Sequence, residues 1–455
     1  MPEEKKPFIQ SEIGSIPSDW NIRTLKDVCL NRKGAIISGP FGSNIGSRFF
    51  VEEGIPVIRG NNLTIDSTNF VDDGFVFITS EKAKELGTWA EQDDLVFTAA
   101  GTLGQIAIIP PKRKFDKYII SNKQLRARID KNLMVPLFAF YWFQSKKMVE
   151  YINLRNTGST IPLINLSVLK SLPIPVPSIQ EQKAIVEVLS AIDSKIELNQ
   201  CMNCTLEAVG AALFRRWFVD FEFPNQEGKP YRSTGGKMTD SELGNIPNGW
   251  SVIGNISELC EEINYGYTQS SCTEEVGPKF LRVMDINKAD WIDWSAVPFC
   301  EIDEKIKSKY LLSEKDIVIA RMADPGKIAI YEAKIPAVFA SYLIRIRLKK
   351  PILAYYIYYL MKSSYYQNFI EGAATGSVQK SLNAKALTNN LPIILPNEEI
   401  ASMFDSIVGL LRKKINLNLE QSTTLSKIRD SLLPKLMSGK IRVPINKENL
   451  EMAVT

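Results

Sequence analysis

The decapeptide Ser11-Glu-Ile-Gly-Ser-Ile-Pro17-Ser-Asp-Trp20 returns 230 positions later as Ser241-Glu-Leu-Gly-Asn-Ile-Pro247-Asn-Gly-Trp250. Both copies keep the proline, the tryptophan and the spacing between them, and each is followed by a cysteine, Cys29 or Cys260. Self-similarity of this kind is the sequence signature of a repeated structural unit. The chain has 455 residues, enough for two or three ordinary domains, so the repeat predicts two copies of one domain.

Further matches follow in the same order along the chain. The offset falls from 230 to 222 and then to 218–219, which indicates that the loops differ in length while the elements persist. The matching pairs are Asp94-Leu-Val-Phe97 and Asp316-Ile-Val-Ile319, Gly104-Gln-Ile-Ala-Ile108 and Gly326-Lys-Ile-Ala-Ile330, Pro136–Ile152 and Ala354–Ile370, Thr157-Gly-Ser159 and Thr375-Gly-Ser377, and Leu172-Pro-Ile-Pro-Val-Pro177 and Leu391-Pro-Ile-Ile-Leu-Pro396.

A long helical pattern follows each of these proline-rich exits. Residues at alternating steps of three and four form a mostly apolar seam from Ile185 to Trp217, and a second seam, offset by 219, begins at Phe404. A period near 3.5 residues is typical of helices that pack on each other. Asn199 and Asn418 fall at equivalent seam positions, where a buried polar residue fixes the register. We expect the two helices to pair, although each could instead pack only on its own domain.

The predicted fold class is α+β, with two similar α/β domains separated by a long antiparallel two-helix coiled coil. A circular pseudo-twofold repeat is expected, because the head and the tail of the chain together resemble the glycine- and proline-rich joint at residues 223–237. The predicted segments are a first domain at 1–177, a first spacer helix at 178–222, a second domain at 223–396, a second spacer helix at 397–438 and a tail at 439–455.

Within the first domain the sequence predicts short strands and one aromatic-rich helix near Pro136–Tyr151. The expected strands are Val57–Arg59, Phe75–Thr79, Leu95–Thr98, Gln105–Ile109 and Gln124–Ile129.

Composition excludes several kinds of chemistry. The chain has no histidine, so catalytic triads and histidine–zinc sites are excluded. Six cysteines form no disulfide framework, and the Cys201-x-x-Cys204 pair lies in a helical pattern with no second pair to complete a zinc site. No phosphate-binding loop or methyltransferase tetrapeptide is present. Glu181 and Asp193 are expected at exposed helix positions rather than in a paired-carboxylate site.

The remaining patterns suit a nucleic-acid partner and a cytoplasmic protein. The amino terminus is polar, and the longest apolar run, near Leu353–Met361, is too short to span a membrane. The net charge is +4, and basic residues cluster at residues 112–128 and 282–347. Glycine-bearing turns carry Asn, Arg, Ser and Thr, which suit hydrogen bonds to base edges and phosphates but also suit ordinary turns. The predicted DNA-contacting residues are Ser43, Arg59, Asn61, Asn62, Thr102, Lys112, Arg113, Lys114, Lys123, Arg126, Tyr267, Arg282, Arg321, Lys327 and Ser377, with Lys117, Arg128, Arg345 and Arg347 in the same basic clusters.

Four segments resemble the specificity subunits of type I restriction–modification systems. Gly39-Pro-Phe-Gly-Ser43 with Gly54-Ile-Pro-Val-Ile-Arg-Gly60 resembles the start of a target-recognition domain in that family. Pro173–Ile185 resembles the entry into its first spacer helix, Leu213-Phe-Arg-Arg-Trp-Phe-Val-Asp220 its exit, and Ser431–Ile441 the end of the second helix. The second copy lacks the Gly-Pro-Phe-Gly-Ser turn and replaces the Thr-Ala-Ala-Gly-Thr loop by Arg321–Lys327. The two domains are therefore not expected to read the same sequence.

The resemblance implies a non-catalytic subunit that binds double-stranded DNA, each domain reading one half of an asymmetric site and the helix pair setting the half-site spacing. It implies two modification (methyltransferase) subunits, which use S-adenosylmethionine, and restriction translocase–nuclease subunits, which use ATP and Mg²⁺, with no cofactor bound by this chain. The predicted subunit-docking residues are Lys183, Phe214, Arg215, Phe218, Leu433 and Leu436. Two alternatives stay open: an autonomous DNA-modifying enzyme, and a coiled-coil scaffold that does not bind DNA.

Overall fold

The computed structural model describes residues 7–63, 70–158, 160–373 and 382–444. The chain forms two compact units, each of which takes in part of both long helices. Unit 1 comprises Met1–Ile196 and Thr424–Thr455, and unit 2 comprises Glu197–Thr423. The units therefore do not coincide with the predicted linear segments, because each helix contributes one part to each unit.

Unit 1 is built around a four-stranded antiparallel sheet in the order β4-β11-β8-β9. A second sheet, β6-β5-β10-β7, contains a parallel pair, β5 with β10. The elements of this unit before the first long helix are β1 (Phe8–Ser11), β2 (Gly14–Pro17), β3 (Asn21–Thr24), β4 (Ile36–Ser38), β5 (Ile55–Ile58), β6 (Val76–Ile78), α1 (Ser80–Leu86), β7 (Trp89–Ala90), β8 (Leu95–Thr98), β9 (Ile106–Ile108), β10 (Tyr118–Ile120), β11 (Gln124–Ala127), α2 (Pro136–Gln144), α3 (Lys146–Asn153), α4 (Leu166–Ser171) and β12 (Pro173–Val176).

Unit 2 repeats this plan. Its four-stranded sheet has the order β16-β21-β18-β19, and its parallel pair is β17 with β20. Its elements before the second long helix are β13 (Met238–Thr239), β14 (Ile246–Pro247), β15 (Ser251–Ile253), β16 (Cys260–Tyr265), β17 (Lys279–Leu281), α6 (Val283–Ile286), α7 (Glu304–Tyr310), β18 (Ile317–Ala320), β19 (Ile328–Ile330), β20 (Ala337–Phe339), β21 (Leu343–Leu348), α8 (Ala354–Lys362), α9 (Ser364–Ala373), α10 (Ala384–Thr388) and β22 (Ile393–Leu395).

The proline-rich exits are strands that close each domain. In unit 1, β12 pairs antiparallel with β3, the strand that follows Trp20. In unit 2, β22 pairs in the same way with β15, which follows Trp250. The repeat found in the sequence is therefore a repeat of topology, and the predicted fold class is confirmed.

The aromatic-rich helix predicted near Pro136–Tyr151 is two helices, α2 and α3, which meet at Ser145. The backbone of Ser145 is extended, and its side chain accepts a hydrogen bond from the amide of Met148, which caps the second helix. Ser363 makes the same break between α8 and α9, and its hydroxyl accepts from the amide of Tyr366. In both copies a capping serine therefore divides the segment into two helices, although its apolar pattern is continuous.

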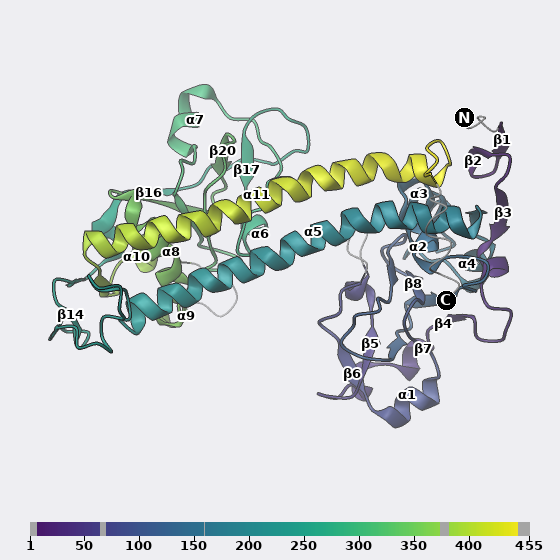
Figure 1. Cartoon of the computed structure of the whole chain (residues 1–455), viewed down its shortest axis with the longest axis horizontal. Coiled ribbons are helices and arrows are strands. Elements are labelled where there is room, and N and C mark those ends of the chain that lie inside the picture. The colour runs from purple at the N-terminus through teal and green to yellow at the C-terminus, as the bar shows by residue number, and fades with distance from the viewer. Residues whose placement is uncertain (1–6, 64–69, 159, 374–381, 445–455) are drawn as a thin grey trace. The chain divides into compact units, whose positions relative to one another are not determined.

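Both predicted spacer helices are present, α5 (Ile179–Phe214) and α11 (Glu398–Met437) (Figure 1). A π-helical turn, η5 (Arg215–Val219), continues α5 and includes the buried Trp217 and Phe218. Contacts within each unit show that the helices run antiparallel. In unit 2, Asn199 donates to Ser422 at 3.1 Å and Asn418 donates to Asn203 at 2.8 Å. In unit 1, Asp193 of α5 contacts Arg429 of α11.

The seam predicted from the period of 3.5 is the buried face of α5. Ile185, Leu189 and Ile196 are at most 6% exposed, and Asn199 and Asn203 are at most 1% exposed. Gly210 lies where a β-carbon would come within 2.1 Å of the Tyr359 hydroxyl, so the helix needs glycine there to let α8 approach. The seam contacts both the partner helix and the domains. The expected helix pairing is therefore confirmed, and the alternative, in which each helix packs only on its own domain, is wrong.

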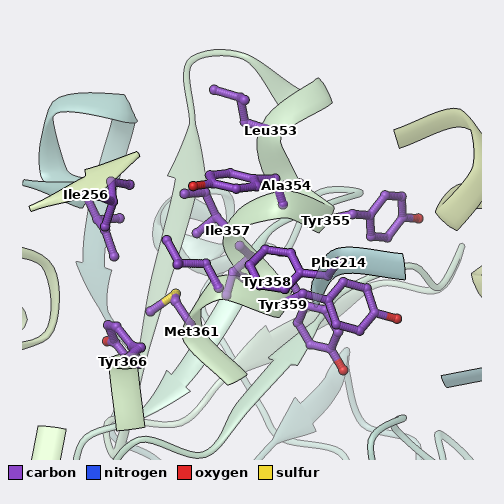
Figure 2. Packing of buried hydrophobic residues seen from close by; sticks show 14 of the residues in the cluster. Phe214, Ile256, Leu353, Ala354, Tyr355, Ile357, Tyr358, Tyr359, Met361 and Tyr366 are labelled. Atoms are coloured by element: carbon purple, nitrogen blue, oxygen red, sulfur yellow. The ribbon is translucent and has the colours of Figure 1, made fainter. Parts of the chain in front are cut away.

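Each unit closes its core with residues from both long helices. In unit 1, Ile185 and Leu189 of α5 and Leu436 and Met437 of α11 are buried with the aromatic face of α2. In unit 2, Phe214 of α5 is buried with the tyrosines of α8, and its ring lies 6.2 Å from that of Tyr359 (Figure 2). Burying this much aromatic surface is the dominant favourable term that fixes the helices to the domains.

Described segments near the two ends of the chain contact each other, as the circular repeat predicts. In unit 1, Gly439 of the tail packs against Pro17 and Trp20, and Arg442 pairs with Asp19 at 3.1 Å. In unit 2, the joint after α5 occupies the corresponding place, because Phe223 stacks on Trp250 with ring centroids 5.0 Å apart. The two repeated tryptophans are therefore the sites where each joint docks.

The expectation that Glu181 and Asp193 are exposed was wrong. Glu181 is 3% exposed, and it accepts a hydrogen bond from the indole of Trp20 and pairs with Arg442. The Asp193 side chain is 11% exposed and lies between the Tyr141 hydroxyl and Arg429. Burial raises the pKa of Asp193, although both of these neighbours favour its charged form. Both carboxylates fasten helices to their surroundings, which a helical period read without tertiary partners does not reveal.

Candidate nucleic-acid interface

Four loops converge at one end of the main sheet of unit 1, and we call them the recognition loops of unit 1: residues 39–44, 58–62, 99–105 and 121–124. Main-chain hydrogen bonds join them. They run from the amide of Gly39 to the carbonyl of Gln124 at 2.9 Å, from Ala99 to Lys123 at 2.7 Å, from Ser121 to Ile58 at 2.9 Å, from Gln124 to Ser121 at 3.1 Å, and from Ile164 to Ala99 at 2.8 Å.

The same five hydrogen bonds recur in unit 2. They define the recognition loops of unit 2: residues 265–267, 281–285, 321–327 and 340–343. They run from Gly266 to Leu343 at 3.1 Å, from Arg321 to Tyr342 at 2.9 Å, from Ala340 to Leu281 at 2.8 Å, from Leu343 to Ala340 at 2.8 Å, and from Leu382 to Arg321 at 2.9 Å. One backbone scaffold is therefore built twice, from loops of different sequence.

A glycine at one place in each cluster permits a close backbone approach. A β-carbon at Gly39 would lie 1.8 Å from the carbonyl oxygen of Ser121, and one at Gly266 would lie 2.1 Å from that of Ala340. No side chain fits at either position. This explains why the second copy can lose the Gly-Pro-Phe-Gly-Ser turn and still keep one glycine of that region.

The exposed side chains on the two scaffolds differ. Asn61 and Lys123 are exposed in unit 1, and the residues at the corresponding places in unit 2 are Met284 and Tyr342, each 50% exposed. Phe41, in the turn of the first copy, is 85% exposed, and Tyr265 of the second copy is 43% exposed. An exposed phenylalanine held between a proline and a glycine was a signal in the sequence that the predicted set left out. Tyr342 carried no such signal.

Several predicted DNA-contacting residues lie on these loops. Ser43, Asn61, Thr102 and Lys123 are exposed in unit 1, and Lys327 is exposed in unit 2. Arg59 and Asn61 donate to the carbonyl of Gly74, which holds the second loop. Ser377 lies outside the described residues.

Other predicted residues on the same loops are engaged within their own domain. Asn62 is fully buried, and its amide donates to the carbonyls of Val71 and Asp73. Arg282 forms a two-point ion pair with Asp285 at 2.9 Å. The Arg321 guanidinium lies over the Tyr265 ring, and Tyr267 packs against Tyr310. These residues shape the loops rather than extend from them.

The basic run at residues 112–114 is partly paired. Lys112 is exposed, whereas Arg113 donates to the side chain of Gln92 at 3.1 Å and to the carbonyl of Pro111 at 2.9 Å. Lys114 pairs with Asp73 at 3.1 Å. The run thus braces the segment that follows the second loop.

Arg126 has a structural place that differs from its predicted role. It is 4% exposed and donates to the carbonyls of Gly34 and Ala35. Its equivalent in the repeat, Arg345, is 1% exposed and pairs with Glu262. Burial lowers the pKa of both guanidinium groups. Buried arginines cannot reach a phosphate.

The neighbouring Arg128 and Arg347 also serve the fold. Arg128 binds Asp94 through two hydrogen bonds of 2.7 Å, and Arg347 binds Asp316 at 2.8 and 2.6 Å. Both aspartates open repeated strand motifs that were visible in the sequence. The sequence signal for this pairing is that Asp94 and Arg128 both recur in the second copy, as Asp316 and Arg347.

The predicted docking residues are divided by burial. Phe214, Phe218 and Leu436 are at most 6% exposed and belong to the cores of their units, so they are not accessible to a partner. Lys183 and Arg215 are exposed, and Leu433 is half-buried. The exposed apolar residues of the two helices include Leu198, Val209, Ile407, Leu410, Leu417 and Ile428.

No helix within the described part of the chain is long and apolar enough to cross a membrane. The sequence model of the family described as "Type I restriction modification DNA specificity domain" matches residues 17–208 and 247–421, which are the two repeats.

Two curated relatives match over nearly their whole length. The chain is 29% identical over 442 residues to the type I restriction enzyme MjaIX specificity subunit of Methanocaldococcus jannaschii, covering 96% of each chain. It is 21% identical over 463 residues to the EcoKI specificity subunit of Escherichia coli, covering 96% of this chain and 93% of that one. The crystal structure of a type I restriction–modification S subunit from M. genitalium matches the fold with a TM-score of 0.53 and 16% identity, over 92% of this chain and 96% of that one. With a family match to both repeats, the chain belongs to the type I restriction–modification DNA specificity family.

Proposed function

We propose that this chain is the sequence-reading subunit of a type I restriction–modification complex, in which the recognition loops of each unit read one half of an asymmetric DNA site. One observation carries the proposal: the same five main-chain hydrogen bonds build both loop clusters, while the exposed side chains differ. A rigid scaffold that presents variable side chains is the usual way in which folds support many specificities.

The exposed residues supply the two kinds of contact that a DNA reader needs. Lys123 and Lys327 can neutralise phosphates, which positions the protein, and Asn61 and Thr102 can hydrogen-bond to base edges, which specifies sequence. Phe41 and Tyr342 add large apolar surfaces for thymine methyl groups or sugar rings. Because the side chains of the two clusters differ, two different half-sites are expected.

Catalysis belongs to the partners in this proposal. Two modification subunits bind the exposed apolar faces of α5 and α11 and carry out S-adenosylmethionine chemistry, and restriction subunits add ATP- and Mg²⁺-dependent translocation and cleavage. This chain binds none of these cofactors, and it works in the cytoplasm with the DNA. The paired helices set the spacing between half-sites, as dimer geometry does in other DNA readers.

The test is methylome sequencing of cells that carry the chain with its modification subunit. Phe41→Ala should relax one half of the methylated sequence and leave the other half unchanged, and Tyr342→Ala should do the converse. Phe8→Ala is the matched control, because Phe8 is 46% exposed in β1, outside the recognition loops. The assignment of one half-site to each unit would be refuted if either variant changed both halves of the methylated sequence. It would also be refuted if both variants gave the same methylated sequence as the Phe8→Ala control.

The two alternatives give different results in vitro. Methyl transfer or cleavage by the purified chain alone would show an autonomous enzyme. A DNA reader should lose affinity steeply with salt, with a log–log slope of about 0.9 per phosphate contact. Duplex binding that is flat with salt would indicate a scaffold.

A further inference from the structure

Each unit holds one buried ion pair between the two long helices. In unit 2, Glu207 of α5 meets Arg412 of α11 at 2.8 Å, with side chains 5% and 2% exposed. In unit 1, Asp193 of α5 meets Arg429 of α11 at 3.2 Å, with side chains 11% and 13% exposed. Both pairs are shielded from solvent, so their charges interact more strongly than surface charges do.

The two ion pairs share one repeat-equivalent position, and its charge is reversed between the copies. The seam offset of 219 residues makes Asp193 the equivalent of Arg412, an acid in one copy and a base in the other. The opposite partners are not related by this offset, since Glu207 corresponds to Ser426 and Arg429 to Gly210. The fold is pseudo-symmetric, but the charge at the position of Asp193 and Arg412 is reversed between the copies.

This reversal decides which helices can pair. We call residues 1–222 the N-terminal half and residues 223–455 the C-terminal half. If two N-terminal halves paired in the observed register, Asp193 would take the place of Arg412 opposite Glu207. If two C-terminal halves paired, Arg412 would take the place of Asp193 opposite Arg429. A pair of N-terminal halves would bury two acid–acid contacts, and Glu207 would also lose Lys362, which belongs to the other half. A pair of C-terminal halves would bury two arginine–arginine contacts, although Arg412 would keep Glu332 of its own half.

The polar centre of the seam does not make this distinction. Asn199 contacts Ser422, and Asn203 contacts Asn418, whose equivalents in the first copy are Asn203 and Asn199. In a pair of N-terminal halves, Asn199 would therefore meet Asn203, and two amides can hydrogen-bond to each other. The apolar positions Ile196 and Leu206 would also face each other. The charges are thus the selective element of the central seam.

We propose that the charge reversal between Asp193 and Arg412 selects the helix partner, so that each half pairs with the other half and rejects a copy of itself. Two like halves would place two identical recognition domains on one helix pair, and the rejection excludes that symmetric product. The inference concerns helix pairing alone and does not depend on DNA binding. It is the kind of like-charge rejection that sets partner choice in coiled coils.

The test uses the full chain, cut after folding. A protease site is inserted at Gly228, in the exposed turn of residues 226–229, where a β-carbon would meet nothing within 4 Å. Isotopically heavy and light preparations are cut, mixed and followed by native mass spectrometry. Exchange of heavy and light halves between unlike pairs shows that the halves dissociate. Once that exchange is complete, we expect like-half pairs at least about tenfold below their statistical share. Like-half pairs at the statistical share would overturn the proposal.

A double variant separates charge from shape. Asp193→Arg with Arg429→Asp reverses the pair of unit 1, so both ion pairs of the intact chain stay complementary. In the two like pairs it also sets an arginine side chain opposite Glu207 and an aspartate side chain opposite Arg412, which removes the repulsion. We expect like-half pairs to rise at least about tenfold over those of the cut parent chain. Asp193→Glu with Arg429→Lys, which keeps the signs, is the control and should stay selective.

Side-chain volume at the helix ends is the competing explanation for partner selection. Phe214 ends α5, and Trp217 and Phe218 lie in the following turn η5, whereas Leu436 and Met437 end α11; these buried sets differ in volume. If the charge-swapped variant exchanges unlike halves but still forms no like pairs, side-chain volume selects the partner and the proposal fails.

Discussion

Loss of Arg412 should strongly destabilise unit 2. Its guanidinium donates to Glu332 at 2.7 and 3.0 Å, to Glu207 at 2.8 Å, and to the carbonyl of Asp290 at 3.1 Å. The Arg412→Met variant keeps the aliphatic contacts but leaves both carboxylates buried without this partner. Lys362 still neutralises Glu207 at 2.7 Å, so the stranded charge is mainly that of Glu332, whose side chain is 8% exposed.

Breaking a buried pair by removing one partner costs about 3–5 kcal/mol. Because Lys362 remains, we expect the lower end, about 3 kcal/mol. For a unit of this size, each kcal/mol shifts the midpoint by about 2–4 °C, so the transition of unit 2 should fall by about 10 °C in differential scanning calorimetry.

Two companion variants identify the cause. Lys413→Met, at the neighbouring exposed position of α11, should change stability by less than about 0.5 kcal/mol. Adding Glu207→Gln and Glu332→Gln to Arg412→Met should recover much of the loss, because the stranded charges are removed. If Arg412→Met behaves like the Lys413 control, the network does not hold the helices to the domain.

Three further predictions concern single side chains. Burial raises the pKa of Asp193 above its ordinary value of 3.8, so the folded state binds the proton more tightly than the unfolded state does. Stability should therefore fall as the pH rises from that value through the raised pKa. Asp193→Asn should reduce the pH dependence of the urea midpoint over this window, and an unchanged dependence would contradict the prediction. Cys201 is exposed, whereas burial raises the pKa of Cys29 to about 12, so maleimide at neutral pH should label the first and spare the second in a peptide map, and equal labelling would show that the domain opens. Asn199 is fully buried, and its side-chain oxygen has no hydrogen-bond partner. Asn199→Leu removes this unpaired oxygen and should raise the free energy of unfolding by about 1 kcal/mol in urea titration. A loss of stability would show that the hydrogen bonds donated by the Asn199 amide contribute more than the unpaired oxygen costs.

The candidate site was predictable only in outline. The loops that carry glycine, asparagine and threonine were identifiable, because these residue types favour turns through local conformation alone. Which arginines extend from the loops was not, because Arg126 and Arg345 look like any other basic residue until strands bring carbonyls and acids around them. The place of Phe41 in a predicted turn, between a proline and a glycine, is visible in the sequence, but its 85% exposure is a property of the fold.

What the sequence determined by itself is the periodic information: two copies of one domain, two long helices with a seam of period 3.5, and the equivalence of Asn199 and Asn418. These follow from local spacing, which every folded arrangement of the chain must respect. Only the tertiary structure decided which polar side chains are buried and which face solvent. Glu181, Asp193 and Arg412 lie on helices whose pattern would suit exposure, and each is buried because a partner of opposite charge from a distant segment arrives at its side chain. A charge is buried when its compensation is close in space, and closeness between distant segments is set by packing and not by spacing along the chain.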